Sequence, residues 1–217
     1  TPFIYLSAFV RGFSPATLVW EVPEASQSGA DVLASTDVSL LATTNIDYHG
    51  PVRIRTAFAN DYQVVAEQVS QRVGIENIWQ TAWRFGMTSL GEQSPGDISY
   101  TDFLDQEVTL LESVHAFSVF SNLGRQTGQK LVVVEQNMQL ESLKPVSVIR
   151  ITDHAGMTLL DWSNPLERSI VSPQLAYLVT NVLSDEASRW PSLGHPNPLE
   201  IGRPAGARLG VSLDGSQ

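Results

Sequence analysis

Hydrophobic residues recur at intervals of three and four along five stretches of the chain. This spacing predicts helices, because residues three and four apart share one face of a helix. A glycine closes each of the first three stretches, as is typical of helix C-termini. The predicted helices cover residues 3–11, 52–73, 75–85, 107–122 and 173–189.

The last of these helices has the clearest pattern. Ser172 is a good N-cap and Pro173 a good first helical residue. The apolar face of this helix consists of Leu175, Leu178, Val179, Val182 and Leu183.

The helix predicted over 52–73 contains an exception to the apolar pattern. Asp61 falls on its apolar face, where a carboxylate is costly unless it is paired.

Later in the chain the pattern changes to one typical of strands. The apolar run 131–134 predicts a strand, and 146–152 and 157–162 flank the hairpin turn Asp153-His154-Ala155-Gly156. One more strand is expected over 205–213. A lone strand lacks partners for its backbone groups, so we expect an incomplete sheet with an exposed apolar edge there. Two stretches without periodicity are predicted loops, 23–50 and 190–204.

The composition excludes several classes of protein. The 217 residues suffice for one sizeable domain. Acidic residues outnumber basic ones 23 to 13, which excludes a sequence-independent nucleic-acid binder, since that class needs a positive field. There is no cysteine, so disulfides, thiolate metal sites and cysteine nucleophiles are excluded. No stretch approaches the roughly 18 apolar residues of a membrane span. The abrupt start inside an apolar helix predicts a fragment, with any targeting or membrane segment outside this chain.

The remaining polar clusters favour structural interpretations. The histidines show no zinc-ligand spacing, so we expect no metal and no cofactor. The acidic patch before the fourth helix fits charges that complement a helix dipole better than a calcium loop or an acid–base pair. The tryptophans are scattered over unlike elements, which favours packing over a sugar-binding platform. The residues concerned are His49, His115, His154, His195; Asp97, Asp102, Asp105, Glu107; and Trp20, Trp79, Trp83, Trp162, Trp190.

Several short stretches together resemble, in the right order, the transpeptidase domain of class A penicillin-binding proteins. The resemblance spans nearly the whole chain and implies one domain over 1–217, truncated at both ends. It implies a mixed α/β fold of the serine β-lactamase type, with a helical lobe packed on an antiparallel sheet. The stretches are Pro2-Phe3-Ile4-Tyr5-Leu6-Ser7-Ala8-Phe9, Phe13-Ser14-Pro15-Ala16-Thr17, Tyr48-His49-Gly50-Pro51-Val52, Ala57-Phe58-Ala59-Asn60, Glu107-Val108-Thr109-Leu110-Leu111, Ser172-Pro173-Gln174-Leu175-Ala176-Tyr177-Leu178, Leu183-Ser184-Asp185 and Arg203-Pro204-Ala205-Gly206.

That family carries out acyl transfer through three motifs, Ser-x-x-Lys, Ser-x-Asn and Lys-Thr/Ser-Gly. The sequence departs from all three. Thr1 stands where the first motif has its lysine, and Asp61-Tyr62-Gln63 replaces the second motif. Arg208-Leu209-Gly210 replaces the third, and Val211 follows where a further hydroxyl is usual. Neither of the two lysines, Lys130 and Lys144, lies in a motif of this kind.

The loss of all three motifs predicts a domain that is catalytically inactive, because a serine hydroxyl attacks poorly without a base. Such a domain is expected to serve as a scaffold or interaction module in the cell envelope, at the outer face of the cytoplasmic membrane. Its expected partners are peptidoglycan stem peptides or cell-wall synthesis proteins, and contact with the membrane would run only through segments outside this chain.

Some binding chemistry is retained at the third motif. Arg208 keeps a cation that can grip a carboxylate, and Gly210 keeps the close backbone approach. Asp61 either pairs with Arg208 or is simply exposed to solvent. Two alternatives stay open: an active acyltransferase with Asp61 as base and Ser7 or an upstream residue as nucleophile, and a module that binds stem peptides without covalent chemistry.

Overall fold

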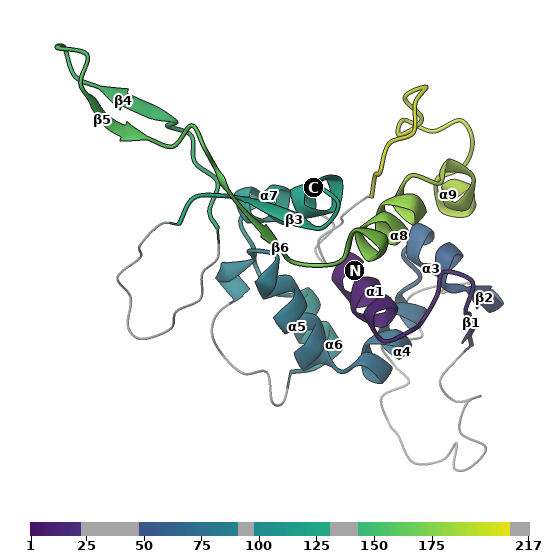
Figure 1. Ribbon diagram of the computed structural model, residues 1–217. Helices are drawn as coiled ribbons and strands as arrows, with labels where there is room; N and C mark the ends of the chain where they lie inside the picture. Colours follow the sequence, from purple (N-terminus) through teal and green to yellow (C-terminus); the bar gives the residue numbers. More distant parts are fainter. Residues whose placement is uncertain (23–47, 91–97, 131–142, 209–217) are drawn as a thin grey trace.

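The computed structural model describes residues 1–22, 48–90, 98–130 and 143–208, in which a group of packed helices is joined to short strand pairs, one of which projects away from it (Figure 1). The helices are α1 (Pro2–Val10), α3 (Ile54–Asn60), α4 (Gln63–Val73), α5 (Ile75–Arg84), α6 (Tyr100–Leu104), α7 (Leu110–Ser121), α8 (Pro173–Leu183) and α9 (Glu186–Leu193), with a 3-10 turn η2 (Thr88–Leu90). The strands are β1 (Leu18–Glu21), β2 (Gly50–Arg53), β3 (Arg125–Gly128), β4 (Arg150–Thr152), β5 (Thr158–Asp161) and β6 (Leu166–Ser169).

Helix α1 lies at the centre of the helical part and contacts α4, α5 and α8 (Figure 1). All its residues from Pro2 to Phe9 are buried. A helix that is hydrophobic all round is typical of a core position, and the helix predicted over 3–11 is confirmed. No helix in the described ranges is both long enough and apolar enough to cross a membrane.

The strands of the described residues form three antiparallel pairs, β1–β2, β3–β6 and β4–β5. The predicted hairpin is confirmed as β4–β5: the Asp153 carboxylate accepts hydrogen bonds from the backbone N–H groups of Ala155 at 2.9 Å and Met157 at 2.7 Å. Helices joined to small antiparallel pairs are consistent with the expected mixed α/β fold and with a sheet that is incomplete in this chain.

The single helix predicted over 52–73 is wrong. Residues 50–53 form β2, and α3 ends at Asp61, whose backbone is left-handed with φ 58° and ψ 44°. Tyr62 is extended, so α4 starts afresh after it. Aspartate is one of the few residues that adopt this conformation readily. The break leaves the Asp61 side chain partly exposed instead of on a continuous apolar face.

The helix predicted over 173–189 is also two helices, α8 and α9. Asp185 caps α9 by accepting a hydrogen bond from the Ser188 N–H at 3.2 Å. Helix α9 continues to Leu193, with Pro191 inside it, where a loop was predicted over 190–204. The local cap therefore overrides the helical pattern that runs through residues 184 and 185.

The fourth predicted helix, 107–122, begins later, as α7. Thr109 and Glu112 form a capping box that fixes this start. His115 is buried as expected, but Leu111 and Val114 are exposed, and the buried face continues through Ala116, Val119 and Phe120. Of the predicted strand over 205–213, the described residues 205–208 belong to no strand. The strand predicted over 131–134, residues 209–213 and most of the loop 23–50 lie outside the described residues.

Candidate functional site

The segment that ends at Arg208 is tied to the C-terminal end of α8. The Ala207 N–H donates to the Leu183 carbonyl at 3.1 Å. The buried Arg189 guanidinium in α9 donates to that carbonyl as well, and to the carbonyls of Ala205 at 3.5 Å and Ala207 at 3.4 Å. Arg189 thus satisfies carbonyls that a helix end leaves open and fixes the backbone from which the Arg208 side chain leaves.

Arg208 is held on several sides at once. Its guanidinium forms an ion pair with Asp61, and its Nη1 donates to the Phe58 carbonyl at 2.6 Å. The guanidinium carbon lies 5.7 Å from the centre of the Phe58 ring, within reach of a cation–π interaction. Only 11% of the side chain is exposed, so the cation that the sequence analysis assigned to a ligand is largely enclosed.

Three of the residues at the altered motif positions meet at the Asp61 carboxylate. Thr1 Oγ1 donates to Asp61 Oδ1 at 3.1 Å, and the Arg208 guanidinium pairs with the same oxygen. The pairing of Asp61 with Arg208, one of two expectations from the sequence, is therefore confirmed. Asp61 keeps 37% of its side chain exposed, so solvent reaches the pair from that side.

Gln63 lies at the start of α4 and is engaged elsewhere. Its Oε1 accepts a hydrogen bond from the Tyr100 hydroxyl at 2.9 Å. Burial, and secondarily the Asp61 carboxylate, raise the pKa of Tyr100, so the phenol remains a donor. Gln63 is thus one more altered position with a filled hydrogen bond. Gly210 and Val211 lie outside the described residues.

The sequence analysis missed two aromatic residues of this site. Tyr5 is fully buried and stacks on Phe58 with ring centres 4.6 Å apart. Its hydroxyl has no hydrogen-bond partner among the described residues, and burial raises its pKa. Tyr5 stands four residues after Thr1, on the same face of α1, and this spacing was the available signal.

A second polar cluster lies beside the start of α4. The buried Glu21 carboxylate accepts a hydrogen bond from His49 Nδ1 at 2.6 Å, and the His49 ring stacks on Tyr62 at 4.3 Å. Burial and the Glu21 charge raise the pKa of Tyr62. Across the described ranges, no group of three or more histidine, aspartate or glutamate side chains is placed to hold a metal ion.

Ser7, the alternative nucleophile, is buried in the interface between α1 and α5. Its hydroxyl donates to Thr81 Oγ1 at 3.0 Å, and Thr81 in turn donates to the Asn77 carbonyl at 2.7 Å. Ser7 is therefore enclosed between the two helices in this structure, and its attack on a substrate stays an untested alternative.

One lysine does contact a hydroxyl, although not through a motif. Lys144 Nζ donates to Thr88 Oγ1 at 2.6 Å, and Thr88 donates to Glu112 Oε1 at 2.6 Å. The hydroxyl therefore lies between a cation and a carboxylate that also caps α7. This chain of hydrogen bonds ties η2 to α7.

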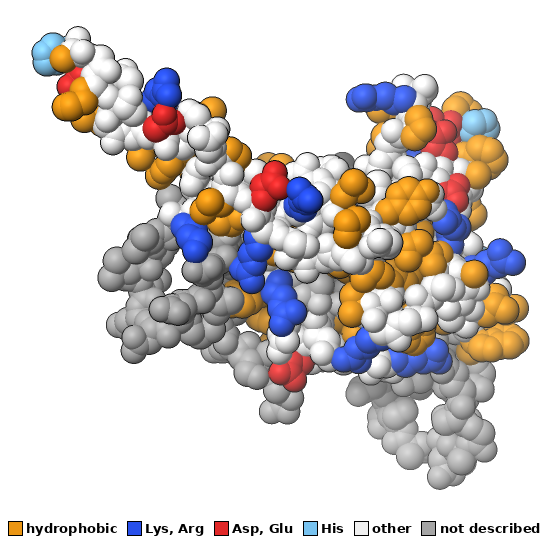
Figure 2. Space-filling view, in the orientation of Figure 1, with side chains coloured by type: hydrophobic (Ala, Val, Ile, Leu, Met, Phe, Trp, Pro, Cys, Tyr) orange, Lys and Arg blue, Asp and Glu red, His pale blue; other side chains and the backbone are white. Residues whose placement is uncertain are grey.

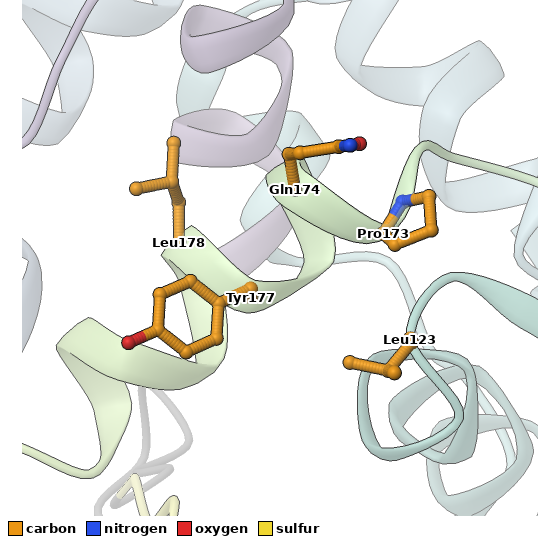
Figure 3. Close-up of a pocket in the computed structure, with 5 residues that line it drawn as sticks. All are labelled: Leu123, Pro173, Gln174, Tyr177 and Leu178. Carbon is orange, nitrogen blue, oxygen red and sulfur yellow. The ribbon is translucent and has the colours of Figure 1, made fainter.

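An open apolar hollow lies between the end of α7 and helix α8 (Figure 3). None of the altered motif positions that the structure describes lines it, so it is separate from the site described above. Its lining residues are Leu123, Pro173, Gln174, Tyr177 and Leu178.

The site contains groups that bind a carboxylate, and a carboxylate of the same chain already occupies them. A guanidinium and a hydroxyl converge on one carboxylate oxygen, as they would on a ligand, but that carboxylate is the chain's own Asp61. No lysine occupies any described position in it.

No protein-family model matches the sequence. Penicillin-binding protein 1A of Clostridium perfringens is 27% identical over 177 residues, covering 76% of this chain and 18% of the relative. Penicillin-binding protein 1A of Clostridium acetobutylicum is 24% identical over 143 residues, covering 65% of this chain and 15% of the relative. The chain thus spans less than a fifth of the length of the curated relatives it matches.

The fold resembles solved penicillin-binding proteins. PonA1 of Mycobacterium tuberculosis matches with a TM-score of 0.61 at 15% identity, over 90% of this chain and 48% of that one. Penicillin-binding protein 1A of Haemophilus influenzae matches with a TM-score of 0.58 at 18% identity, over 84% of this chain and 28% of that one.

Proposed function

The chain has the fold of a penicillin-binding-protein transpeptidase domain, and from this premise we propose that it is a catalytically inactive domain of that kind. It serves cell-wall synthesis as a scaffold or interaction module. The observation that supports the proposal is that side chains at the altered motif positions already bind each other. Arg208, which replaces the lysine of the third motif, is paired with Asp61 from the second, so two motif positions neutralise each other.

Acyl transfer through a hydroxyl needs a base that is free to take its proton. Among the altered motif positions, Thr1 brings a hydroxyl to a carboxylate, since it donates to Asp61. The Arg208 guanidinium pairs with the same carboxylate oxygen, and a guanidinium is permanently charged. Proton transfer from Thr1 to Asp61 would neutralise the carboxylate that pairs with the largely enclosed Arg208 guanidinium, which opposes the reaction.

The direct test is turnover of a thioester that mimics a D-Ala-D-Ala stem peptide. We expect the 217-residue chain to hydrolyse it no faster than buffer does, and the Asp61→Asn variant to behave the same. A rate above buffer that disappears in Asp61→Asn would overturn the proposal and identify Asp61 as a working base. A rate that survives in that variant would overturn it as well and place the chemistry elsewhere in the chain.

The cellular setting is part of the proposal. The domain acts at the outer face of the cytoplasmic membrane, among cell-wall synthesis proteins, and is attached to the membrane through segments outside this chain. The similarity to penicillin-binding protein 1A sequences supports this setting. Protease accessibility from outside the cell tests it: a domain cleaved only after lysis would contradict the placement.

A second candidate function is non-covalent binding of a stem-peptide carboxylate, and the convergence of Thr1 and Arg208 on one carboxylate favours it. Asp61 competes with any such ligand. We therefore expect N-acetyl-D-alanyl-D-alanine to give no heat of binding with the natural chain and measurable heat with Asp61→Asn. The double variant Asp61→Asn/Arg208→Gln is the matched control and should bind nothing. If Asp61→Asn binds nothing either, the candidate is rejected.

A further inference from the structure

Arg189 in α9 is the largest fully buried side chain of the described residues, with 1% of its surface exposed. Charged side chains of both signs lie on the surface around α9 and the segment that follows it (Figure 2), whereas this guanidinium is enclosed. A guanidinium is permanently charged, so it cannot escape the cost of burial by losing a proton. Arg189 therefore needs compensation from inside the fold.

One nitrogen of the Arg189 guanidinium has partners. Nη1 donates to the carbonyls of Leu183, Ala205 and Ala207. The first of these carbonyls lies at the C-terminal end of α8, where the helix dipole favours a cation. Carbonyl groups carry no net charge, however, so they offset only part of the charge of Arg189.

The other two nitrogens, Nε and Nη2, are buried and have no hydrogen-bond partner in the part of the chain that the structure describes. Buried N–H groups without a partner are rare, because each loses its bonds to water and gains none in return. The Nε–H and one Nη2–H of a guanidinium point the same way along one edge of the planar group, and this edge matches the two oxygens of a carboxylate or phosphate. The unpartnered atoms of Arg189 thus form one complete fork.

No acidic side chain among the described residues fills this fork. The ion pairs of the described arginines join Arg55, Arg125, Arg150 and Arg208 to their carboxylates, and none includes Arg189. The acidic residues that flank α9 are engaged elsewhere. Asp185 pairs with Arg55 at 2.8 Å, and Glu200 accepts hydrogen bonds from Trp190 at 3.1 Å and Asn197 at 2.7 Å.

The charge and the fork geometry together determine which partner fits. A water molecule satisfies an N–H but leaves the charge uncompensated. A chloride ion compensates the charge but lacks the paired oxygens that the fork matches. A small oxyanion provides both. We propose that the Nε–Nη2 edge of Arg189 is a buried binding site for one small oxyanion, either a phosphate or a small carboxylate.

The position of Arg189 gives such an anion a structural role. The same guanidinium holds the carbonyls of Ala205 and Ala207, so a bound anion would stabilise the segment that ends at Arg208. Residues 201–204 and 206 of this segment are exposed, and its local opening would let the anion exchange. The inference goes beyond the proposed function and does not depend on it: catalytic turnover would leave this site intact, and absence of an anion would leave the proposed inactivity intact.

Thermal unfolding of the 217-residue chain, dialysed into a cationic buffer, tests the inference. Sodium phosphate and sodium acetate are added in separate titrations up to about 10 mM, against sodium chloride of equal ionic strength, so that general salt effects cancel. We expect a saturable rise of about 5 °C in the melting temperature with the preferred oxyanion, and the comparison distinguishes a phosphate site from a carboxylate site. An anion that survives dialysis would be released on unfolding and be detected by ion chromatography as one equivalent per chain.

Arg189→Lys keeps the positive charge but lacks the planar fork, so it should lose the response to oxyanions. Arg203→Lys is the matched control, because it makes the same substitution at an exposed arginine of the following segment; it should respond as the natural chain does.

A natural chain with neither a saturable response nor a retained oxyanion would overturn the inference and leave buried water as the partner. An equal response of Arg189→Lys and Arg203→Lys would overturn it as well. If Arg189→Lys does not fold, as circular dichroism would reveal, the natural chain provides a second measurement. The arginine Nε–H resonance that is best protected from exchange should shift with the oxyanion and not with chloride, and an unchanged resonance would reject the site.

Discussion

Asp61 has a left-handed backbone and forms an ion pair. The first is a local feature of the chain, and the second is a contact between distant segments. The left-handed backbone ends α3, and the carboxylate meets Arg208 from a segment nearly 150 residues later in the chain. The sequence showed that Asp61 needed a partner and that Arg208 was available. It could not show the helix break, because the apolar residues before and after residue 61 keep the same helical spacing.

We expect Asp61→Asn and Asp61→Ala to differ in stability. Asparagine tolerates the left-handed conformation, so Asp61→Asn loses only the charge pairing, about 1 kcal/mol for a partly exposed pair. Alanine also pays a backbone penalty of about 1 kcal/mol. Urea unfolding of the two variants beside the natural chain measures both steps. Equal stability of the two variants would contradict the left-handed assignment at residue 61.

Tyr5 and Phe58 illustrate a different limit at this scale. Both lie within predicted helices, 3–11 and 52–73, and both are buried. In the site, the Phe58 ring contacts the Arg208 guanidinium and the Tyr5 ring stacks on Phe58. These contacts depend on how α1 and α3 pack together. Periodicity along one helix does not contain that information.

At the scale of elements, the start of α7 depends on one carboxylate. Burial alone would raise the pKa of Glu112, but hydrogen bonds from Ser89 and Thr88, and from the backbone of Ser89 and Thr109, outweigh it and lower the pKa to about 2. A pKa lowered by folding gives stability that is present above the unfolded value near 4.5 and is lost as the pH falls toward 2.

Glu112→Gln should therefore make the stability of the protein depend less on pH in the acid range. Between about pH 5 and pH 2.5 we expect the melting temperature of the natural chain to fall more than that of Glu112→Gln. The exposed Glu107→Gln controls for the loss of one carboxylate and should follow the natural chain. Parallel acid limbs for all three proteins would contradict the role of Glu112.

Two glycines allow the cost of steric crowding to be measured separately from the cost of a left-handed backbone. Gly124, between α7 and β3, and Gly156, in the hairpin turn, have similar φ values of 85° and 81°. A Cβ on Gly124 would lie 2.2 Å from the Val171 carbonyl oxygen, whereas one on Gly156 would meet nothing within 4 Å. The two positions thus share a backbone requirement and differ only in space.

We expect Gly156→Ala to cost about 1 kcal/mol, the penalty of a left-handed residue with a side chain. Gly124→Ala should cost about 3 kcal/mol or more, because the backbone of residue 171 must also move. Thermal unfolding of the two variants gives the comparison. A Gly124→Ala variant as stable as Gly156→Ala would mean that the β3–β6 pair is placed differently.

The elements that the sequence predicted correctly are those with local signals. The hairpin turn at 153–156, the apolar helix 3–11 and the cap at Ser172 are each determined within a few residues. Some predictions failed at local caps and turns, as at Asp185, Thr109 and Asp61, and one failed through distant contacts. Residues 205–208 were expected in a strand, but their backbone is bound by the end of α8 and by Arg189, which no local pattern reveals.

At the scale of the whole molecule, the similarity to the transpeptidase domain indicates the fold, whereas the altered motifs predict the loss of acyl transfer. The fold agrees with solved penicillin-binding proteins, one of which is PonA1 of Mycobacterium tuberculosis in complex with penicillin V. In this chain, two of the positions that correspond to the family's motifs hold Asp61 and Arg208, which form an ion pair. The sequence alone revealed the altered positions, and the structure added that two of them neutralise each other.

The proposed inactivity predicts that this domain forms no acyl-enzyme with a β-lactam. Intact-mass spectrometry of the 217-residue chain after incubation with benzylpenicillin tests it most directly, with an active penicillin-binding-protein transpeptidase domain as a parallel control. The account predicts an unchanged mass for this chain while the control gains one penicilloyl group. A stoichiometric mass increase on this chain would contradict the account.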